Sequence, residues 1–197
     1  MIIFLGLAGS GKGTQGKALS ELFGWRTLSI GQAIRDTGGY SEIIDKGGLI
    51  PDQDVVRLMS EKITRCEDEG FDVILDGFPR TEFQAKWLTE NMADKVYGVI
   101  ILEVPKEELY ERLNLRARED DIELASITRR FEVFEKHIDK ILPLFAEKQI
   151  PITKVSGVGD VDEITRRLVK VVQSYDPNAT IQAHDVNGEE IEKSYGE

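Results

Sequence analysis

The sequence has few of the residue types that mark disulfide-stabilised, zinc-bound or membrane-embedded proteins. Its 197 residues include a single cysteine, Cys66, which excludes an internal disulfide and a cysteine-based zinc site. The chain has no apolar run of the roughly 20 residues that a membrane-spanning helix needs, and its apolar start carries no basic leader. We therefore expect a cytoplasmic protein without a membrane partner.

Positive charge is also scarce. Lysine and arginine total 25 against 36 aspartate and glutamate residues, so the formal net charge is -11 at pH 7. This balance argues against a nucleic-acid or anionic-membrane partner, whereas a small anionic ligand could still bind where basic side chains cluster. A hydrophobic content of 41% and a charged content of 31% are ordinary for one soluble globular domain.

Glycine, by contrast, is concentrated near the start of the chain, in MIIFLGLAGSGKGTQ. Ile2–Leu5 have the pattern of a short buried strand, and the residues after Thr14 have helical spacing. A glycine loop between a strand and a helix lets backbone N–H groups and the positive helix end converge on a phosphate. Lys12 would then contact the β- and γ-phosphates, and Thr14 the magnesium that they carry. The alternative, a glycine-rich turn without a ligand, is disfavoured because Gly6, Gly11 and Lys12 fall at phosphate-loop spacing.

Five short apolar runs rich in β-branched residues alternate with helix-patterned stretches. The runs cover Ile2–Leu5, Arg26–Ile30, Asp72–Leu75, Val96–Val104 and Pro151–Val155. This alternation predicts an α/β fold, with a five-stranded parallel sheet and helices on both faces. Because ligands of such sheets bind at the carboxyl ends of the strands, we expect the site among the residues that follow each run.

The stretch FDVILDGFPRT carries the second chemical signal. Asp76 ends a predicted buried strand, at the edge where the glycine loop should lie. A carboxylate there can hold Mg2+ through its water shell, although an aspartate in a helix N-cap or a turn would give the same pattern. The turn Gly77–Arg80 directs the Arg80 guanidinium to the same edge, and a guanidinium suits bidentate binding of phosphate.

Arginines gather in a third stretch, ELYERLNLRAREDDIELASITRRF. A solvated helix explains part of the pattern, because Glu108 and Arg112 form an i,i+4 pair. It does not explain why Arg112 and Arg116 share one helix face with Arg118 just beyond. Since like charges at this spacing repel unless an anion lies among them, we favour a phosphate-binding role.

Together, GxxGxGKGTQ, LDGFPRT and RxDD before a helical arginine resemble the adenylate kinase and wider nucleoside monophosphate kinase family, in its short-lid form. The resemblance runs from Met1 to about Tyr175. It implies a fold of the phosphate-loop NTPase type, with a single kinase domain over 1–175. Within it, a small monophosphate-binding arm would span about 29–50 and a minimal lid about 112–125. The acidic residues 176–197 are expected to form a disordered tail.

The resemblance also implies roles for individual residues. ATP would be bound by Gly9, Ser10, Gly11, Lys12, Gly13, Thr14, Arg112 and Gly159. AMP would be bound by Ile30, Arg35, Gly48, Leu49, Ile50, Gly77, Phe78, Pro79, Arg80, Gln84, Arg118 and Arg130. Catalysis would rest on Lys12, Arg80, Arg116, Arg118 and Arg130, and Asp76 would hold Mg2+ through water.

Several positions depart from the usual pattern of this family. Ile30 and Gln32 stand where these kinases usually have threonine and aspartate, and Ala8 replaces a common proline in the phosphate loop. The arm is shorter than expected by roughly two helical turns, and the lid lacks a glycine-bearing loop. The floor of the monophosphate pocket is therefore expected to differ from that of the family.

The activity implied by the resemblance is reversible phosphoryl transfer from Mg·ATP to AMP, giving two ADP, by a monomer. Gln84 after FPRT favours AMP as the acceptor, since UMP/CMP kinases tend to have asparagine after FPR. An AMP phosphate is already ionised at neutral pH, its second pKa being about 6, so the reaction needs no general base. The alternatives are a UMP/CMP or broad-specificity nucleoside monophosphate kinase, and a non-catalytic nucleotide-binding regulatory protein.

Overall fold

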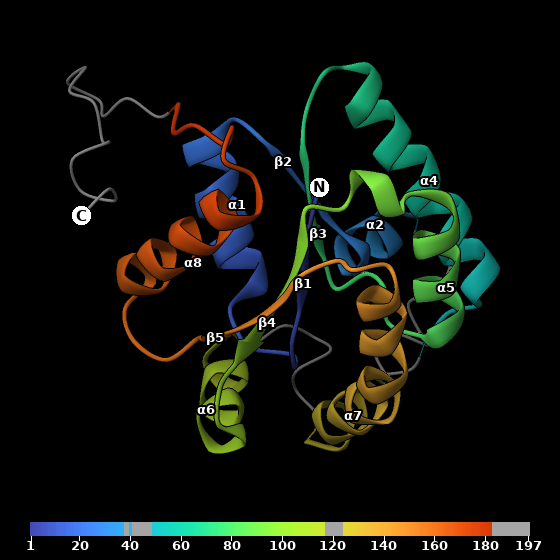
Figure 1. Cartoon of the computed structure of the whole chain (residues 1–197). Helices are drawn as coiled ribbons and strands as arrows, with labels where there is room; N and C mark the ends of the chain where they lie inside the picture. Colours follow the sequence, from blue (N-terminus) through green and yellow to red (C-terminus); the bar gives the residue numbers. More distant parts are fainter. Residues whose placement is uncertain (38–39, 41–48, 117–123, 183–197) are drawn as a thin grey trace.

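A five-stranded parallel sheet forms the centre of the protein (Figure 1). The computed structural model describes residues 1–37, 40, 49–116 and 124–182. The strands, in the order β2-β3-β1-β4-β5 across the sheet, are β1 (Ile2–Leu5), β2 (Arg26–Ser29), β3 (Val73–Asp76), β4 (Gly98–Glu103) and β5 (Ile152–Ser156). The predicted fold class and the five parallel strands are confirmed, and each strand end lies within two residues of its predicted position.

The strands send alternate side chains into two hydrophobic cores, one on each face of the sheet. In β1, Ile2 and Phe4 belong to one core, whereas Ile3 and Leu5 belong to the other. These four side chains are at most 2% exposed. Burial on both faces explains why the sequence of β1 is a continuous apolar run rather than an alternating pattern.

Helices cover both faces of the sheet. They are α1 (Lys12–Phe23), α2 (Ile30–Thr37), α4 (Asp52–Asp68), α5 (Glu82–Asn91), α6 (Lys106–Arg116), α7 (Leu124–Glu147) and α8 (Val161–Tyr175), with a 3-10 turn, η1 (Ala93–Lys95). α1 and α8 pack around Phe4 in what we call the α1/α8 core. α2, α4, α5 and α7 pack around Ile3 in the α4/α5 core. Figure 1 shows α1 and α8 on one side of the sheet and α4, α5 and α7 on the other.

A third, smaller core joins α6 to the first half of α7. It consists of Leu109, Leu113, Ile127 and Phe131. Leu7 and Ala8 of the glycine loop pack against it. The loop that follows β1 is therefore supported from outside the sheet by two helices that the sequence places more than a hundred residues later.

The chain beyond α8 remains in contact with the body of the protein as far as the structure describes it. Ala179 is buried in the α1/α8 core, and the Gln182 backbone N–H donates to the Leu22 carbonyl at 2.7 Å. Only 183–197 of the expected tail lie outside the described residues, as do 38–39 and 41–48 of the arm and 117–123 of the lid. Among the described residues, no helix combines the length and the apolar character that crossing a membrane requires.

Candidate active site

The carboxyl ends of the central strands meet at one edge of the sheet and open into a cavity of about 890 Å³. The register pairs Asp76 of β3 with Phe4 of β1 on one side and with Ser29 of β2 on the other. The glycine loop leaves β1 at this edge. The volume lies near the upper end of the range for ligand pockets.

The glycine loop turns tightly from β1 into α1. Gly6 follows β1 with φ of 143°, and a Cβ there would lie 2.6 Å from the Leu102 carbonyl oxygen, so no other residue fits. Gly11 caps α1 with φ of 96°, in the left-handed region that favours glycine. The Gln15 N–H donates to the Gly11 carbonyl at 2.9 Å as the first turn of α1 forms. Gly11, Lys12, Gly13 and Thr14 line the cavity, and the N–H groups at the start of a helix can donate to an anion bound there.

Lys12, the first residue of α1, bends back over the loop. Its Nζ donates to the carbonyl oxygens of Gly6 at 2.9 Å and Leu7 at 2.8 Å, and to Ser10 Oγ at 3.3 Å. These contacts hold the ammonium at the mouth of the loop, in the cavity wall. A phosphate that enters the loop would meet the lysine at once.

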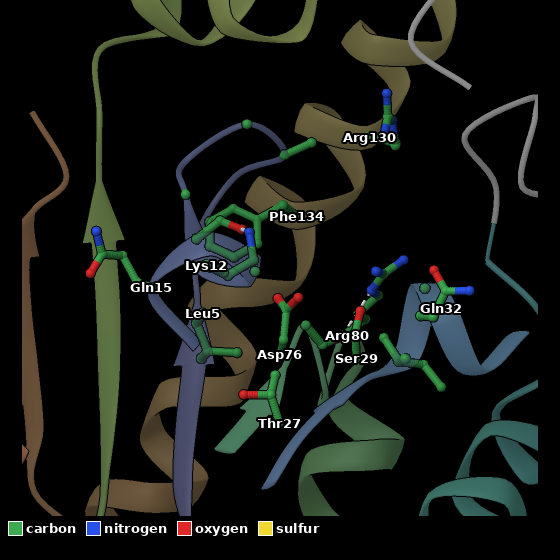
Figure 2. A pocket seen from close by; sticks show the side chains of 18 of the residues that line it. Leu5, Lys12, Gln15, Thr27, Ser29, Gln32, Asp76, Arg80, Arg130 and Phe134 are labelled. Carbon is green, nitrogen blue, oxygen red and sulfur yellow. Dashed lines mark hydrogen bonds between the residues drawn. The ribbon is translucent and has the colours of Figure 1, made fainter. Parts of the chain in front are cut away.

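Asp76 lies across the cavity from the loop. A Cβ on Gly13 would be 3.5 Å from Asp76 Oδ2, so the carboxylate faces the start of α1 directly. Figure 2 shows Asp76 with Lys12 on one side and Arg80 on the other. A partly exposed carboxylate beside the phosphate loop and the Thr14 hydroxyl offers the oxygen donors that Mg2+ prefers.

Two guanidinium groups, those of Arg35 and Arg80, lie beside Gly31 in the cavity wall. A Cβ on Gly31 would lie 3.5 Å from Arg35 Nη1 and 3.7 Å from Arg80 Nη2, so both side chains approach the same glycine. The Arg80 Nε donates to the Gly77 carbonyl at 2.9 Å, and a Cβ on Gly77 would lie 3.2 Å from Arg80 Nη2, so the guanidinium lies against its own turn while it also approaches Gly31. Because like charges repel at close range, this pair is arranged for an anion between them.

Gln84 is held in place on the same side. It is 1% exposed yet lines the cavity. Its Oε1 accepts from the Arg80 backbone N–H at 2.7 Å, and its Nε2 donates to Asp52 Oδ1 at 2.8 Å. Thr81 caps α5 by accepting from the Gln84 N–H. The turn that carries Arg80 thus also positions the side-chain amide of Gln84.

Arg112 and Gly159 also line the cavity, and Arg112 lies beside the glycine loop. Arg112 donates to the Gly157 carbonyl at 2.9 Å and pairs with Glu108, as its spacing predicted. A Cβ on Gly11 would lie 4.0 Å from Arg112 Nη1, so the guanidinium reaches the phosphate loop. Gly159 follows β5 and lines the cavity.

Most of the residues proposed from the sequence come together at the cavity wall. Those that line it are Gly9, Gly11, Lys12, Gly13, Thr14, Ile30, Arg35, Leu49, Ile50, Asp76, Gly77, Pro79, Arg80, Gln84, Arg112, Arg130 and Gly159. Ser10 and Phe78 are buried behind the wall, with exposed fractions of 1% and 0%. Arg116 is the last residue of α6, and Gly48 and Arg118 lie outside the described residues.

Sequence reasoning missed the part that α7 plays beyond Arg130. Val133, Phe134 and Ile141 of this helix also line the cavity, and Phe134 is among the labelled lining side chains in Figure 2. A signal was available, because residues three and four positions after an arginine that faces a site share its helix face. Asp52 was missed as well, since its contact with Gln84 joins residues 32 positions apart.

Comparison with known proteins agrees with this geometry. A model of the adenylate kinase family matches residues 4–150, which include the glycine loop, Asp76, Arg80 and Arg130. The chain belongs to the adenylate kinase family. The adenylate kinase of Thermus thermophilus is 33% identical over 182 residues, covering 85% of this chain and 94% of that protein. The adenylate kinase of Maricaulis maris is 35% identical over 187 residues (87% and 98%), and that of Micrococcus luteus 32% over 189 residues (88% and 90%).

The two positions that the sequence analysis singled out in the floor of the monophosphate pocket both lie at the cavity. Ile30 is 1% exposed, and with Ile34 it joins the α4/α5 core while also lining the cavity. Gln32 lines the cavity and donates to Asp36 at 2.7 Å. This part of the cavity wall therefore presents apolar surface at Ile30 and an amide at Gln32.

Proposed function

We propose that the protein transfers the terminal phosphoryl group of Mg·ATP to AMP, reversibly, to give two ADP. The observation that carries this proposal is the convergence of the glycine loop, Asp76 and the arginine pair Arg35 and Arg80 on one cavity. The adenylate kinase names of the curated relatives support the same reaction.

ATP would occupy the donor end of the cavity. The N–H groups at the start of α1 would bind its phosphates, and Gly159 would approach the base by its backbone. Lys12 would leave the carbonyls of Gly6 and Leu7 and follow the transferred phosphate. Arg112 would add charge at the loop, where it already lies beside Gly11.

AMP would occupy the acceptor end. Arg35 and Arg80 would hold its phosphate between two guanidinium forks, which bind phosphate oxygens in pairs. Leu49, Ile50 and Ile30 supply apolar surface for the nucleoside. Gln84 would contact the edge of the adenine ring with the N–H and the lone pair that its protein contacts leave available.

The transfer itself is a matter of positioning and charge. An ionised oxygen of the AMP phosphate forms a bond to the γ-phosphorus, while the bond from that phosphorus to the β–γ bridging oxygen breaks and its electron pair stays on the departing ADP. Lys12, Arg80 and Arg130 would neutralise the charge that spreads over the transferring group. A side-chain base is not required, because the AMP phosphate has lost its protons by neutral pH.

Magnesium fits the donor end of the site. Asp76 and Thr14 would hold it, through water and through the hydroxyl, beside the phosphates bound by the loop. When bound, the ion neutralises phosphate charge during transfer. The closeness of Asp76 to the start of α1 supports this assignment.

The test is ADP formation by the purified protein with Mg·ATP and each of AMP, CMP, UMP and GMP in turn. Fast ADP formation with AMP alone is expected. Activity with CMP or UMP would move the acceptor to a pyrimidine nucleotide, and activity with none would leave a nucleotide-binding protein without catalysis. We also propose that the protein acts as a monomer, and we place it in the cytoplasm because its lone cysteine suits a reducing compartment.

A further inference from the structure

Asp52 joins the helix that follows the monophosphate arm to the residue proposed to contact adenine. It is the first residue of α4, and its Oδ1 accepts two hydrogen bonds from the turn and helix of the LDGFPRT segment. Thr81 Oγ1 donates at 2.8 Å and Gln84 Nε2 also donates at 2.8 Å. Thr81 and Gln84 are 6% and 1% exposed, so the donors of both bonds are buried, whereas Asp52 itself is partly exposed.

The chemistry of the partners determines which way the Gln84 amide points. A backbone N–H can only donate, so the Arg80 N–H must face the amide oxygen. An ionised carboxylate can only accept, so Asp52 must face the amide nitrogen. The same reasoning directs the Thr81 proton to Asp52 and its lone pair to the Gln84 N–H, as observed. The amide is therefore clamped at both ends.

We propose that Asp52 is a positioning residue for base selection, which holds the Gln84 amide in the one orientation that matches a 6-amino purine and opposes a 6-oxo purine. This inference rests on the proposed contact between Gln84 and the acceptor base. The clamped amide has one N–H and one oxygen lone pair left. Adenine offers N1 as an acceptor and N6–H as a donor, which match, whereas hypoxanthine offers N1–H and O6, which have the reverse polarity.

Buried polar groups of fixed direction discriminate strongly, since a mismatched ligand leaves them without partners. A freely turning amide would lose that discrimination, because it could present either polarity. Removal of Asp52 leaves only the Arg80 N–H to favour the native orientation. The loss of selectivity should consequently be partial rather than complete.

The experiment compares AMP with IMP, which differ only at the base edge that the amide would contact. We measure kcat/KM for both acceptors with Mg·ATP in the wild type, Asp52→Ala and Asp52→Asn. The AMP/IMP ratio should fall about ten-fold in Asp52→Ala, as expected for a freed hydrogen bond to a charged group. In Asp52→Asn, which keeps an acceptor oxygen, the ratio should stay within about three-fold of wild type.

Two further variants separate this role from a merely structural one. Asp54→Ala removes another carboxylate from the first turn of α4, one that accepts from Tyr40 at 2.7 Å and pairs with Arg57 at 3.7 Å. It should leave the AMP/IMP ratio unchanged. Gln84→Ala should lower the ratio by itself, and adding Asp52→Ala to it should lower the ratio no further, because Asp52 acts through the amide.

Each outcome of these measurements either supports or overturns the inference. A lower ratio in Asp52→Ala, with retention in Asp52→Asn and no extra effect without Gln84, supports the inference. An equal fall in kcat/KM for both nucleotides, or a further fall in the Gln84→Ala background, overturns it while leaving the proposed function intact. An unchanged ratio in Gln84→Ala overturns both the inference and the adenine contact. If Asp52→Ala does not fold, as circular dichroism would show, the Asp52→Asn and Gln84→Ala results still decide.

Discussion

Replacement of Arg80 by lysine tests the acceptor side of the site with the smallest change of charge. The guanidinium projects from the turn after β3, with its Nε donating to the Gly77 carbonyl at 2.9 Å. The guanidinium also lies beside Arg35 at Gly31, on the cavity wall, where it can contact a phosphate. Lysine would keep one positive charge but has a single nitrogen at the end of a flexible stem.

The expected fall in kcat/KM follows from the hydrogen bonds that the Arg80 guanidinium can make. Lysine cannot make the bond to Gly77 and also contact two phosphate oxygens, so at least one charge-assisted hydrogen bond is lost in the transition state. Such a bond contributes about 1.5–3 kcal/mol, which corresponds to a fall in kcat/KM of about ten-fold to a hundred-fold. Stability should change by less than about 1 kcal/mol, because Arg80 is exposed.

The assay is steady-state ADP formation at saturating Mg·ATP with AMP varied, and thermal unfolding measures stability. Arg65→Lys is the matched control, since Arg65 is an exposed arginine of α4 that pairs with Glu69 at 3.0 Å. It should retain wild-type kinetics. An Arg80→Lys enzyme with unchanged kcat/KM would refute the reasoning and remove Arg80 from the phosphate site.

Three other predictions concern the metal, the core and alkaline pH. Asp76→Asn should raise the Mg2+ concentration for half-maximal rate at least about ten-fold; an unaltered magnesium titration would contradict the role of Asp76. Phe145→Ala, at a site of 0% exposure in the α4/α5 core, should lower the free energy of unfolding in urea by about 3–5 kcal/mol, and a loss below about 1 kcal/mol would mean the core refills the space. Burial, with a hydrogen bond to Asp72, raises the pKa of Tyr97 to about 12. The native state therefore favours the neutral phenol. The free energy of unfolding that this contributes is fully present below pH 10 and is lost between pH 10 and 12. Wild type should lose about 1–2 kcal/mol more than Tyr97→Phe over that window, allowing for the partial exposure of the ring, and equal losses would exclude Tyr97 as the cause.

The sequence was sufficient for the fold because the central strands β1, β3 and β4 are buried on both faces along most of their length. Runs such as Ile2–Leu5 have no competing helical period, and glycine or proline punctuates their ends. The site edge followed from the rule that ligands bind at strand carboxyl ends, which predicted that Lys12, Asp76 and Arg80 lie together. Local order along the chain was enough for these residues because Asp76 ends β3, Arg80 lies in the turn after it, and Lys12 begins the helix that follows β1.

The rest depended on contacts that local order does not encode. Asp52 reads as an ordinary acidic residue in the first turn of a helix, and its bond to Gln84 exists only because α4 packs beside α5. Phe134 reads as a core residue of α7, and the tertiary fold decides that its face meets the cavity. Residues 176–182 read as part of a polar tail, yet Ala179 and Ile181 are enough to pack them against the body.

Because each face of the sheet has its own hydrophobic core, the elements packed on one face can change without repacking the other face. The phosphate loop enters α1, which rests on the core around Phe4, whereas α2, α4 and α5, which carry the acceptor side, rest on the core around Ile3. Neighbouring positions of one strand thus support different substrates. A substitution that repacks the core around Ile3, which includes Ile30, can therefore reshape the acceptor side of the cavity without disturbing the loop that enters α1.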